Sequence, residues 1–181
     1  MTPTPTVPLT PQAAVTQVGL PAGARVLSTL SRIDYQDAFE VGTGVQRTAE
    51  QWARAVLQDA PLTVRTRLVS SWLALGLKLG SPWAAERVLG WKIQHRDPDT
   101  VLLTAGSRFG LQGQLLFRSD GTDLLFATFV QQDNPAARAV WGRIEHQHRF
   151  VVRSLLRHAA RREARRGLAP TEKASPSTIC C

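Results

Sequence analysis

The 181-residue chain has few cysteines and no long hydrophobic run, and both absences narrow its possible settings. Its only cysteines are the last two residues, Cys180 and Cys181, so we expect no disulfide in the core and an exposed C-terminal end. The longest apolar segment, residues 68–79, contains polar residues and is shorter than the ~20 residues that cross a bilayer. The first residues lack the basic and apolar regions of a secretory signal peptide. We therefore expect a cytoplasmic protein with no transmembrane segment.

Lysine is also scarce, with three lysines against nineteen arginines and a formal net charge of +8. Five of the arginines crowd into the stretch 157–166, where a single glutamate opposes them: Arg157, Arg161, Arg162, Arg165 and Arg166. Such a cluster can make a weak contact with an anionic surface, but it can also be a solvated helix end. No nucleic-acid fold signature and no interleaved aromatic residues accompany it, so nucleic acid is not an expected partner.

The composition indicates one domain with a tail at each end. An apolar share of 43% in a chain of this length supports a single substantial core. Residues 1–24 are rich in Thr and Pro, and residues 167–181 are rich in Pro, Ser and Thr. Both segments are predicted to be disordered tails. The single domain is therefore expected over residues 25–166.

A long helix is predicted from Asn134 to about Arg166. Asp133 and Asn134 offer a capping oxygen, and Pro135 occupies the first helical position, where a missing N–H costs nothing. Apolar residues and one histidine then recur at intervals of three and four, which is typical of a helix with one buried face. These residues are Val140, Trp141, Ile144, His148, Val151, Val152, Leu155 and Ala159. We expect that face to cover a sheet.

The rest of the chain predicts strands and two shorter helices. Alternating apolar and polar residues indicate strands, and apolar residues at helical spacing indicate helices. The predicted elements are a strand over 31–41, a helix opened by a Thr48–Gln51 capping box, a helix over 62–79, and strands over 90–96, 100–107, 111–119 and 123–131. Short, turn-rich joints, among them Asp120-Gly121, make the last four strands an antiparallel meander. The fold class is α+β, and no strand is predicted between Leu79 and Gly90.

Several sequence blocks resemble those of a known superfamily. The blocks are DYQDAF (34–39), TAEQWARAV (48–56), LGWKI (89–93), ATFV (127–130) and AVWGRIEHQHRFVVRSLL (139–156). Together with the order of the elements, they are similar to the helix-grip fold of the START and birch-pollen-allergen (SRPBCC, polyketide cyclase-like) superfamily, and more narrowly to a bacterial family of unassigned function within it. The resemblance covers about residues 30–162. It implies a cavity between the sheet and the C-terminal helix that binds a lipid, a polyketide or another apolar ligand; no cofactor is expected.

One aspartate and two histidines are the candidates for acid–base chemistry. Asp37 lies on a strand face with apolar side chains, so its burial would require either a partner such as His148 or an arginine, or a raised pKa. The alternative for Asp37 is a position at the end of the strand or on its exposed face. His148 lies on the apolar face of the long helix, and His95 shares a strand face with Trp91; for these two, a purely structural role is the alternative. His146 and His148 are two residues apart and point to different faces of a helix, so no metal site is predicted.

Aromatic side chains supply most of the expected lining of the cavity. The residues predicted to bind the ligand are Tyr35, Phe39, Trp91, Trp141 and His148. We favour a non-catalytic carrier or sensor of an apolar small molecule. The first alternative is a cyclase- or dehydratase-like enzyme that uses Asp37 and His148, and the second is an interaction protein that docks through the arginine-rich helix end.

Overall fold

The structure is a computed structural model that describes residues 14–167. Over these residues the chain forms a seven-stranded antiparallel sheet with helices on both faces, which confirms the α+β class. The elements are β1 (Val15–Val18), α1 (Ala22–Arg25), β2 (Tyr35–Gly42), α2 (Ala49–Ala53) continued by a π-helical segment (Arg54–Gln58), α3 (Leu62–Ala74), β3 (Arg87–Val88), β4 (Trp91–Arg96), β5 (Thr100–Ala105), β6 (Leu111–Asp120), β7 (Asp123–Gln132) and α4 (Pro135–Gly167). The strand order is β1-β2-β7-β6-β5-β4-β3, so the predicted meander is confirmed for β4 to β7.

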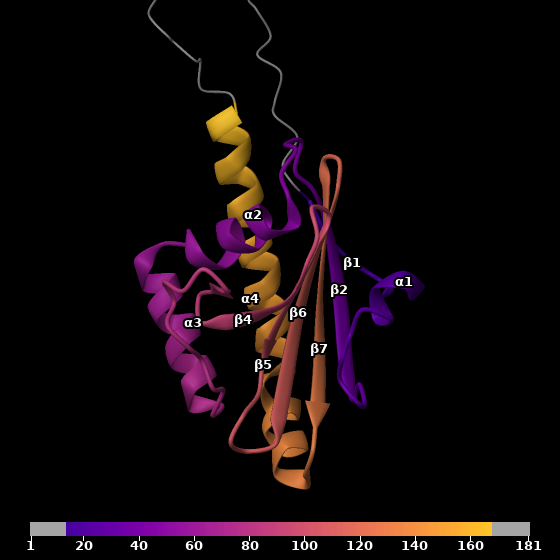
Figure 1. Cartoon of the computed structure of the whole chain (residues 1–181), viewed down its shortest axis with the longest axis vertical. Coiled ribbons are helices and arrows are strands. Elements are labelled where there is room, and N and C mark those ends of the chain that lie inside the picture. The colour runs from indigo at the N-terminus through magenta and orange to yellow at the C-terminus, as the bar shows by residue number, and fades with distance from the viewer. Residues whose placement is uncertain (1–13, 168–181) are drawn as a thin grey trace, which may run out of the picture.

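The sheet has two apolar faces, and each of them is covered (Figure 1). The inner face packs against α2, α3 and α4, and the core between them includes Trp52, Phe117 and Leu156. The outer face is covered by the N-terminal segment that contains α1, which packs near Leu116 and Phe129. Because β5 and β7 are buried on both sides, they appear in the sequence as nearly continuous apolar runs.

The disordered tail predicted over residues 1–24 is wrong from residue 14 onward, because β1 and the beginning of α1 occupy this stretch. β1 pairs with β2, and the segment after it crosses the outer face of the sheet. Without this cover the apolar outer face would be exposed to water, so burying it stabilises the fold. Residues 1–13 and 168–181, and with them the remaining tail predictions, Cys180 and Cys181, lie outside the described residues.

The connection between α1 and β2 is held by a buried glutamine of the sheet. The side-chain oxygen of Gln114, on β6, accepts hydrogen bonds from Ser28 Oγ at 2.9 Å and from the backbone N–H of Thr29 at 3.2 Å. The Gln114 amide N–H donates in turn to Thr29 Oγ1 at 2.6 Å. A buried polar side chain that is satisfied in this way fixes one position of the covering segment.

Both short helices begin where the sequence predicts, but α3 ends earlier than predicted. The Thr48–Gln51 capping box is confirmed: Gln51 N–H donates to Thr48 Oγ1 at 3.2 Å, and Thr48 N–H donates to Gln51 Oε1 at 3.1 Å. The prediction that the second helix extends to Leu79 is wrong, since α3 ends at Ala74. Gly76 adopts a φ of 72°, the left-handed conformation that commonly ends a helix. The two-residue β3 lies in the stretch before β4 where no strand was predicted.

The long helix α4 matches its predicted span, and Asn134 Oδ1 accepts the capping hydrogen bond from the Ala137 N–H at 2.8 Å. Its buried stripe runs from Trp141 through Val152 to Ala159 and packs on the inner face of the sheet. Val140 was assigned to this stripe but is 38% exposed, because it lies about 100° around the helix from Trp141. Within residues 14–167, no helix combines the length and the hydrophobicity that crossing a bilayer requires.

Candidate functional site

A cavity of about 360 Å³ lies between the inner face of the sheet and the helices α3 and α4. Trp91 and Leu115 contribute from the sheet, Trp72 from α3, and Trp141 and Val152 from α4. Trp72 and Trp91 pack edge to face, with ring centroids 5.4 Å apart. The volume falls at the lower end of the ~300–1,000 Å³ that is typical of small-molecule sites.

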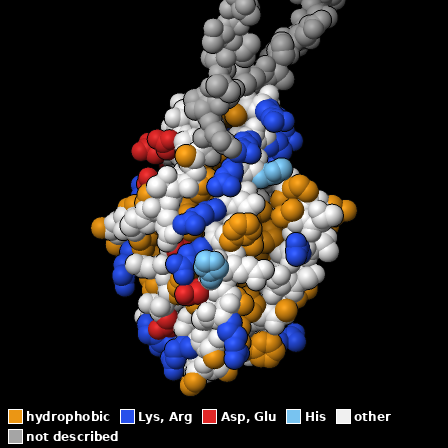
Figure 2. Space-filling view, turned by 180° about the vertical axis from the view of Figure 1, so that it is seen from behind, with side chains coloured by type: hydrophobic (Ala, Val, Ile, Leu, Met, Phe, Trp, Pro, Cys, Tyr) orange, Lys and Arg blue, Asp and Glu red, His pale blue; other side chains and the backbone are white. Residues whose placement is uncertain are grey.

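The cavity opens between α3 and α4. The lining residues from the sheet are all buried, whereas Ser71 and Ala74 on α3 and Gln147 on α4 line the cavity and are exposed. A small molecule would therefore enter between the two helices and come to rest against the strands. Figure 2 shows the face of the molecule opposite to the view of Figure 1, with hydrophobic side chains beside an oblique line of basic ones.

The lining is almost entirely apolar. Within residues 14–167, no Asp, Glu, Lys or Arg side chain lines this cavity, and the polar side chains that do are Ser71, Thr128, Gln147 and His148. The indole N–H groups of Trp91 and Trp141 have no hydrogen-bond partner among the described residues. His148 is thus the one titratable side chain of the described lining.

A buried carboxylate lies directly behind His148. Asp37 on β2 is the register partner of Thr128 on β7, so both side chains project from the inner face toward α4. His148 Nε2 is 3.5 Å from Asp37 Oδ2 and 3.1 Å from Thr128 Oγ1, and Tyr35 Oη donates to the same Asp37 oxygen at 2.7 Å. Only 5% of Asp37 is exposed. The structure therefore brings Asp37 and His148 together, and Asp37 has the partner that its burial requires.

The contacts around Asp37 shift the pKa values of Asp37 and Tyr35 in opposite directions. Burial by itself raises the pKa of Asp37, but the hydrogen bond and positive charge of His148, with hydrogen bonds from Tyr35 and Thr128, outweigh burial and lower that pKa below its usual value. Burial, followed by the hydrogen bond to Asp37, raises the pKa of the Tyr35 hydroxyl. At neutral pH, Asp37 is a carboxylate and Tyr35 is a protonated donor.

The lowered pKa of Asp37 predicts a loss of stability in acid. Because the native state holds the Asp37 proton less tightly than the unfolded chain does, this stabilisation is complete above the ordinary aspartate value near 3.8 and is lost as the pH falls below it. We expect the unfolding free energy of the wild type to drop more steeply between pH 5 and 2.5 than that of Asp37→Asn. Urea denaturation across this range measures the difference. Asp120→Asn, at an exposed carboxylate, is the matched control, and equal slopes for wild type and Asp37→Asn would contradict the prediction.

The residues predicted to bind the ligand lie partly inside and partly outside the lining of the cavity. Trp91, Trp141 and His148 line the cavity. Tyr35 lies beside it, with its ring 4.9 Å from that of Trp141. Phe39 is wholly buried and outside the lining, with the Arg153 guanidinium 5.4 Å from its ring centre.

The prediction that His95 shares the inward face of its strand with Trp91 is wrong. The pairing of β4 with β5 shifts register between Ile93 and His95, so the alternation of faces is broken just before the histidine. His95 is exposed, and its Nε2 lies 2.6 Å from Asp97 Oδ2 outside the cavity. His95 therefore has no part in this site.

The sequence reasoning missed three polar lining residues, Ser71, Thr128 and Gln147. Thr128 carried a usable signal, because it is the lone hydroxyl in the apolar run of β7. Gln147 carried none, since an exposed polar residue on a helix is ordinary. Within the described part of the chain, no three His, Cys, Asp or Glu side chains gather closely enough to hold a metal ion.

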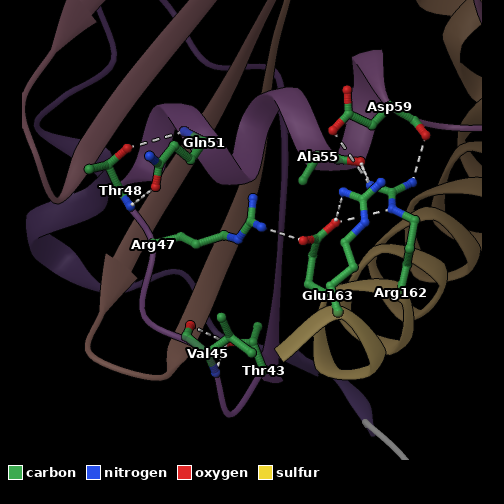
Figure 3. Close-up of polar contacts among 10 residues, drawn as sticks. Thr43, Val45, Arg47, Thr48, Gln51, Ala55, Asp59, Arg162 and Glu163 are labelled. Carbon is green, nitrogen blue, oxygen red and sulfur yellow. Dashed lines mark hydrogen bonds and ion pairs between the residues drawn. The ribbon is translucent and has the colours of Figure 1, made fainter. Parts of the chain in front are cut away.

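The arginines at the end of α4 divide into two groups. Glu163 is 1% exposed and is surrounded by Arg47, Arg162 and Arg166, at 3.1 Å for Arg162 Nε and 3.0 Å for an Arg166 terminal nitrogen. Arg162 also donates to the backbone oxygens of Ala55 and Asp59, which ties α4 to the helical layer (Figure 3). Arg162 and Arg166 are thus both engaged by Glu163, although the Arg166 side chain is still 59% exposed. Contact of the five arginines with an anionic surface stays a prediction.

The other three arginines of the predicted face, Arg157, Arg161 and Arg165, are exposed. They lie on the side of α4 that points away from the sheet.

Compared with known proteins, the chain matches no protein-family model and no curated protein.

Proposed function

We propose that this protein binds an uncharged, apolar small molecule in the cavity between the sheet, α3 and α4, as a carrier or a sensor. The observation that supports this proposal is a cavity of about 360 Å³ whose described lining is apolar except for four polar side chains. The antiparallel sheet with a long C-terminal helix is compatible with the helix-grip fold that the sequence resemblance implied. Assignment to that superfamily is part of the proposal.

The charge around the cavity favours an uncharged ligand. A carboxylate in the cavity would find no arginine or lysine in the described lining, and His148 already faces the Asp37 carboxylate. Burying a charge without a full counter-charge costs several kcal/mol. A hydroxyl or carbonyl group can instead hydrogen-bond to His148, Thr128 or Gln147 without that cost.

A matched pair of probes tests this proposal. 1-Dodecanol and dodecanoate share a carbon chain and differ in the charge of the head group. Trp72, Trp91 and Trp141 line the cavity, so intrinsic tryptophan fluorescence reports its occupation. We expect dodecanol to bind at least ~10-fold more tightly than dodecanoate, or about 1.4 kcal/mol. Tighter binding of dodecanoate would contradict the uncharged ligand, and failure of both probes, together with no co-purified molecule in native mass spectrometry, would contradict the ligand-binding proposal.

A second candidate function is acid–base catalysis on the bound molecule. It is favoured by the Asp37–His148 contact of 3.5 Å beside the cavity, where a carboxylate orients an imidazole that can take or give a proton. In the same native mass-spectrometry experiment, this candidate expects a ligand that the wild type alters in mass and His148→Gln leaves unchanged. Identical ligand masses from both proteins would favour the carrier.

A further inference from the structure

The basic charge of this protein is concentrated on α4. This helix carries nine arginines and two glutamates, against a net charge of +8 for the whole chain. Both glutamates are already engaged within the fold: Glu145 accepts a hydrogen bond from Arg149 at 3.1 Å, and Glu163 is buried in its ion cluster. The outward side of α4 is therefore positively charged without nearby compensation from the helix itself.

Five of these arginines form one continuous row. They repeat at intervals of four residues, which places them along a single ridge of the helix about 24 Å long: Arg149, Arg153, Arg157, Arg161 and Arg165. The first two are held by the fold, since Arg149 pairs with Glu145 and Arg153 donates to Gln17 at 2.7 Å. Within residues 14–167, Arg157, Arg161 and Arg165 form no ion pair and are exposed.

Apolar side chains accompany this ridge. Phe150, on α4 itself, is 70% exposed. The helical positions of Arg157 and Arg161 each fall about 20° from that of Phe150, on either side of it, so the phenylalanine lies between these two arginines around the helix. Figure 2 shows this association of basic and hydrophobic side chains on one face. The mouth of the cavity includes the exposed Gln147, which lies about 60° around α4 from Phe150.

We propose that this face of α4 docks on the surface of an anionic phospholipid bilayer and that the cavity exchanges its ligand there. The negatively charged lipid phosphates complement the arginine row. The apolar boundary between the head groups and the acyl chains can bury the Phe150 ring, which is exposed to water in the free protein. The ligand-exchange part rests on the proposed function, whereas the docking part does not. A nucleic acid would complement the arginines equally well, but it would offer no apolar phase to Phe150 or to the mouth of the cavity.

Vesicle co-sedimentation of the full chain tests the docking. We expect binding to vesicles of phosphatidylcholine mixed with an equal amount of phosphatidylglycerol, weak binding to phosphatidylcholine alone, and loss of binding when salt is raised from ~0.1 M to ~1 M. The triple variant R157Q/R161Q/R165Q should bind the anionic vesicles more weakly by on the order of 100-fold, because each such arginine contributes about fivefold. The control variant R25Q/R108Q/R118Q removes the same charge from exposed positions elsewhere and should bind like the wild type within about threefold.

Three results would overturn the inference: no preference for anionic vesicles, equal losses in the two triple variants, or tighter binding to a single-stranded RNA or duplex DNA than to vesicles at equal phosphate concentration. Phe150→Ser changes no charge, so it would not affect a purely electrostatic contact. If the ring enters the bilayer interface, this variant should bind vesicles more weakly at low salt, with an unchanged salt dependence. Dodecanol binding without vesicles tests the ligand proposal separately. A protein that binds dodecanol but not anionic vesicles overturns the docking and the exchange at the bilayer, while the proposed function stands. One that binds vesicles but no apolar probe overturns the exchange and the proposed function, while the docking stands.

Discussion

Substituting tryptophan for Ser71 is expected to weaken dodecanol binding by roughly 100-fold, or about 3 kcal/mol. Ser71 is exposed on α3 and lines the mouth of the cavity, so a large side chain can be added there without displacing the buried core. The indole would occupy the space between α3 and α4 through which the probe enters and in which it rests. Fluorescence titration or native mass spectrometry with dodecanol measures the loss.

The neighbouring residue provides the matched control. Ser70 is exposed on the same helix but does not line the cavity, so Ser70→Trp should bind dodecanol like the wild type within about twofold. Both variants should unfold within a few degrees of the wild type, because neither position is buried. Equal affinities for Ser71→Trp and Ser70→Trp would show that the ligand does not occupy this cavity.

Truncating Glu163 should clearly lower the stability of the fold. Glu163 accepts ion pairs from Arg47, Arg162 and Arg166, and its removal leaves three neighbouring cations without their common counter-charge. Breaking a buried pair in this way costs about 3–5 kcal/mol. The arginine side chains are 20–59% exposed and can recover some hydration, so we expect about 2–3 kcal/mol for Glu163→Ala, or a decrease in Tm of roughly 5–10 °C.

Glu145→Ala is the control for this experiment, because Glu145 pairs with Arg149 on the same helix but at the surface. Exposed pairs four residues apart contribute only about 0.3–0.5 kcal/mol. Thermal and urea unfolding of the two variants therefore compares the same substitution at a buried and at an exposed carboxylate. A loss for Glu163→Ala no larger than that for Glu145→Ala would mean that the cluster contributes little to stability.

The sequence predicts those parts of the fold that depend on local signals. The helical period and the Asn134 cap locate α4, and apolar segments separated by short, turn-rich joints locate β4 to β7. The N-terminal strand is missed because four residues of β1 carry almost no pattern of their own, and β1 forms through its pairing with β2. Gly76 was a readable stop for α3, but the apolar residues around it masked that signal.

The candidate site is predictable only in part, for two different reasons. The pairing of Asp37 with His148, far apart in the chain, follows from the cost of burying a lone charge. By contrast, the register shift that turns His95 outward leaves no mark in the sequence. The cavity itself is also invisible there, because apolar residues at helical or alternating spacing look the same whether they fill a core or line an open space.

The position of β2 in the sheet has a consequence for how the chain reaches its native state. On one side β2 is paired with β7, so the inter-strand hydrogen bonds of residues 35–42 on that side cannot form until residues 123–130 are present. After β2 ends at Gly42, some eighty further residues must be synthesised before β7 begins and the two strands can pair. Contacts at such sequence separation slow folding, since the intervening chain must be ordered before the pairing is gained. The first half of the polypeptide is thus exposed to non-native association until the last strand has been synthesised.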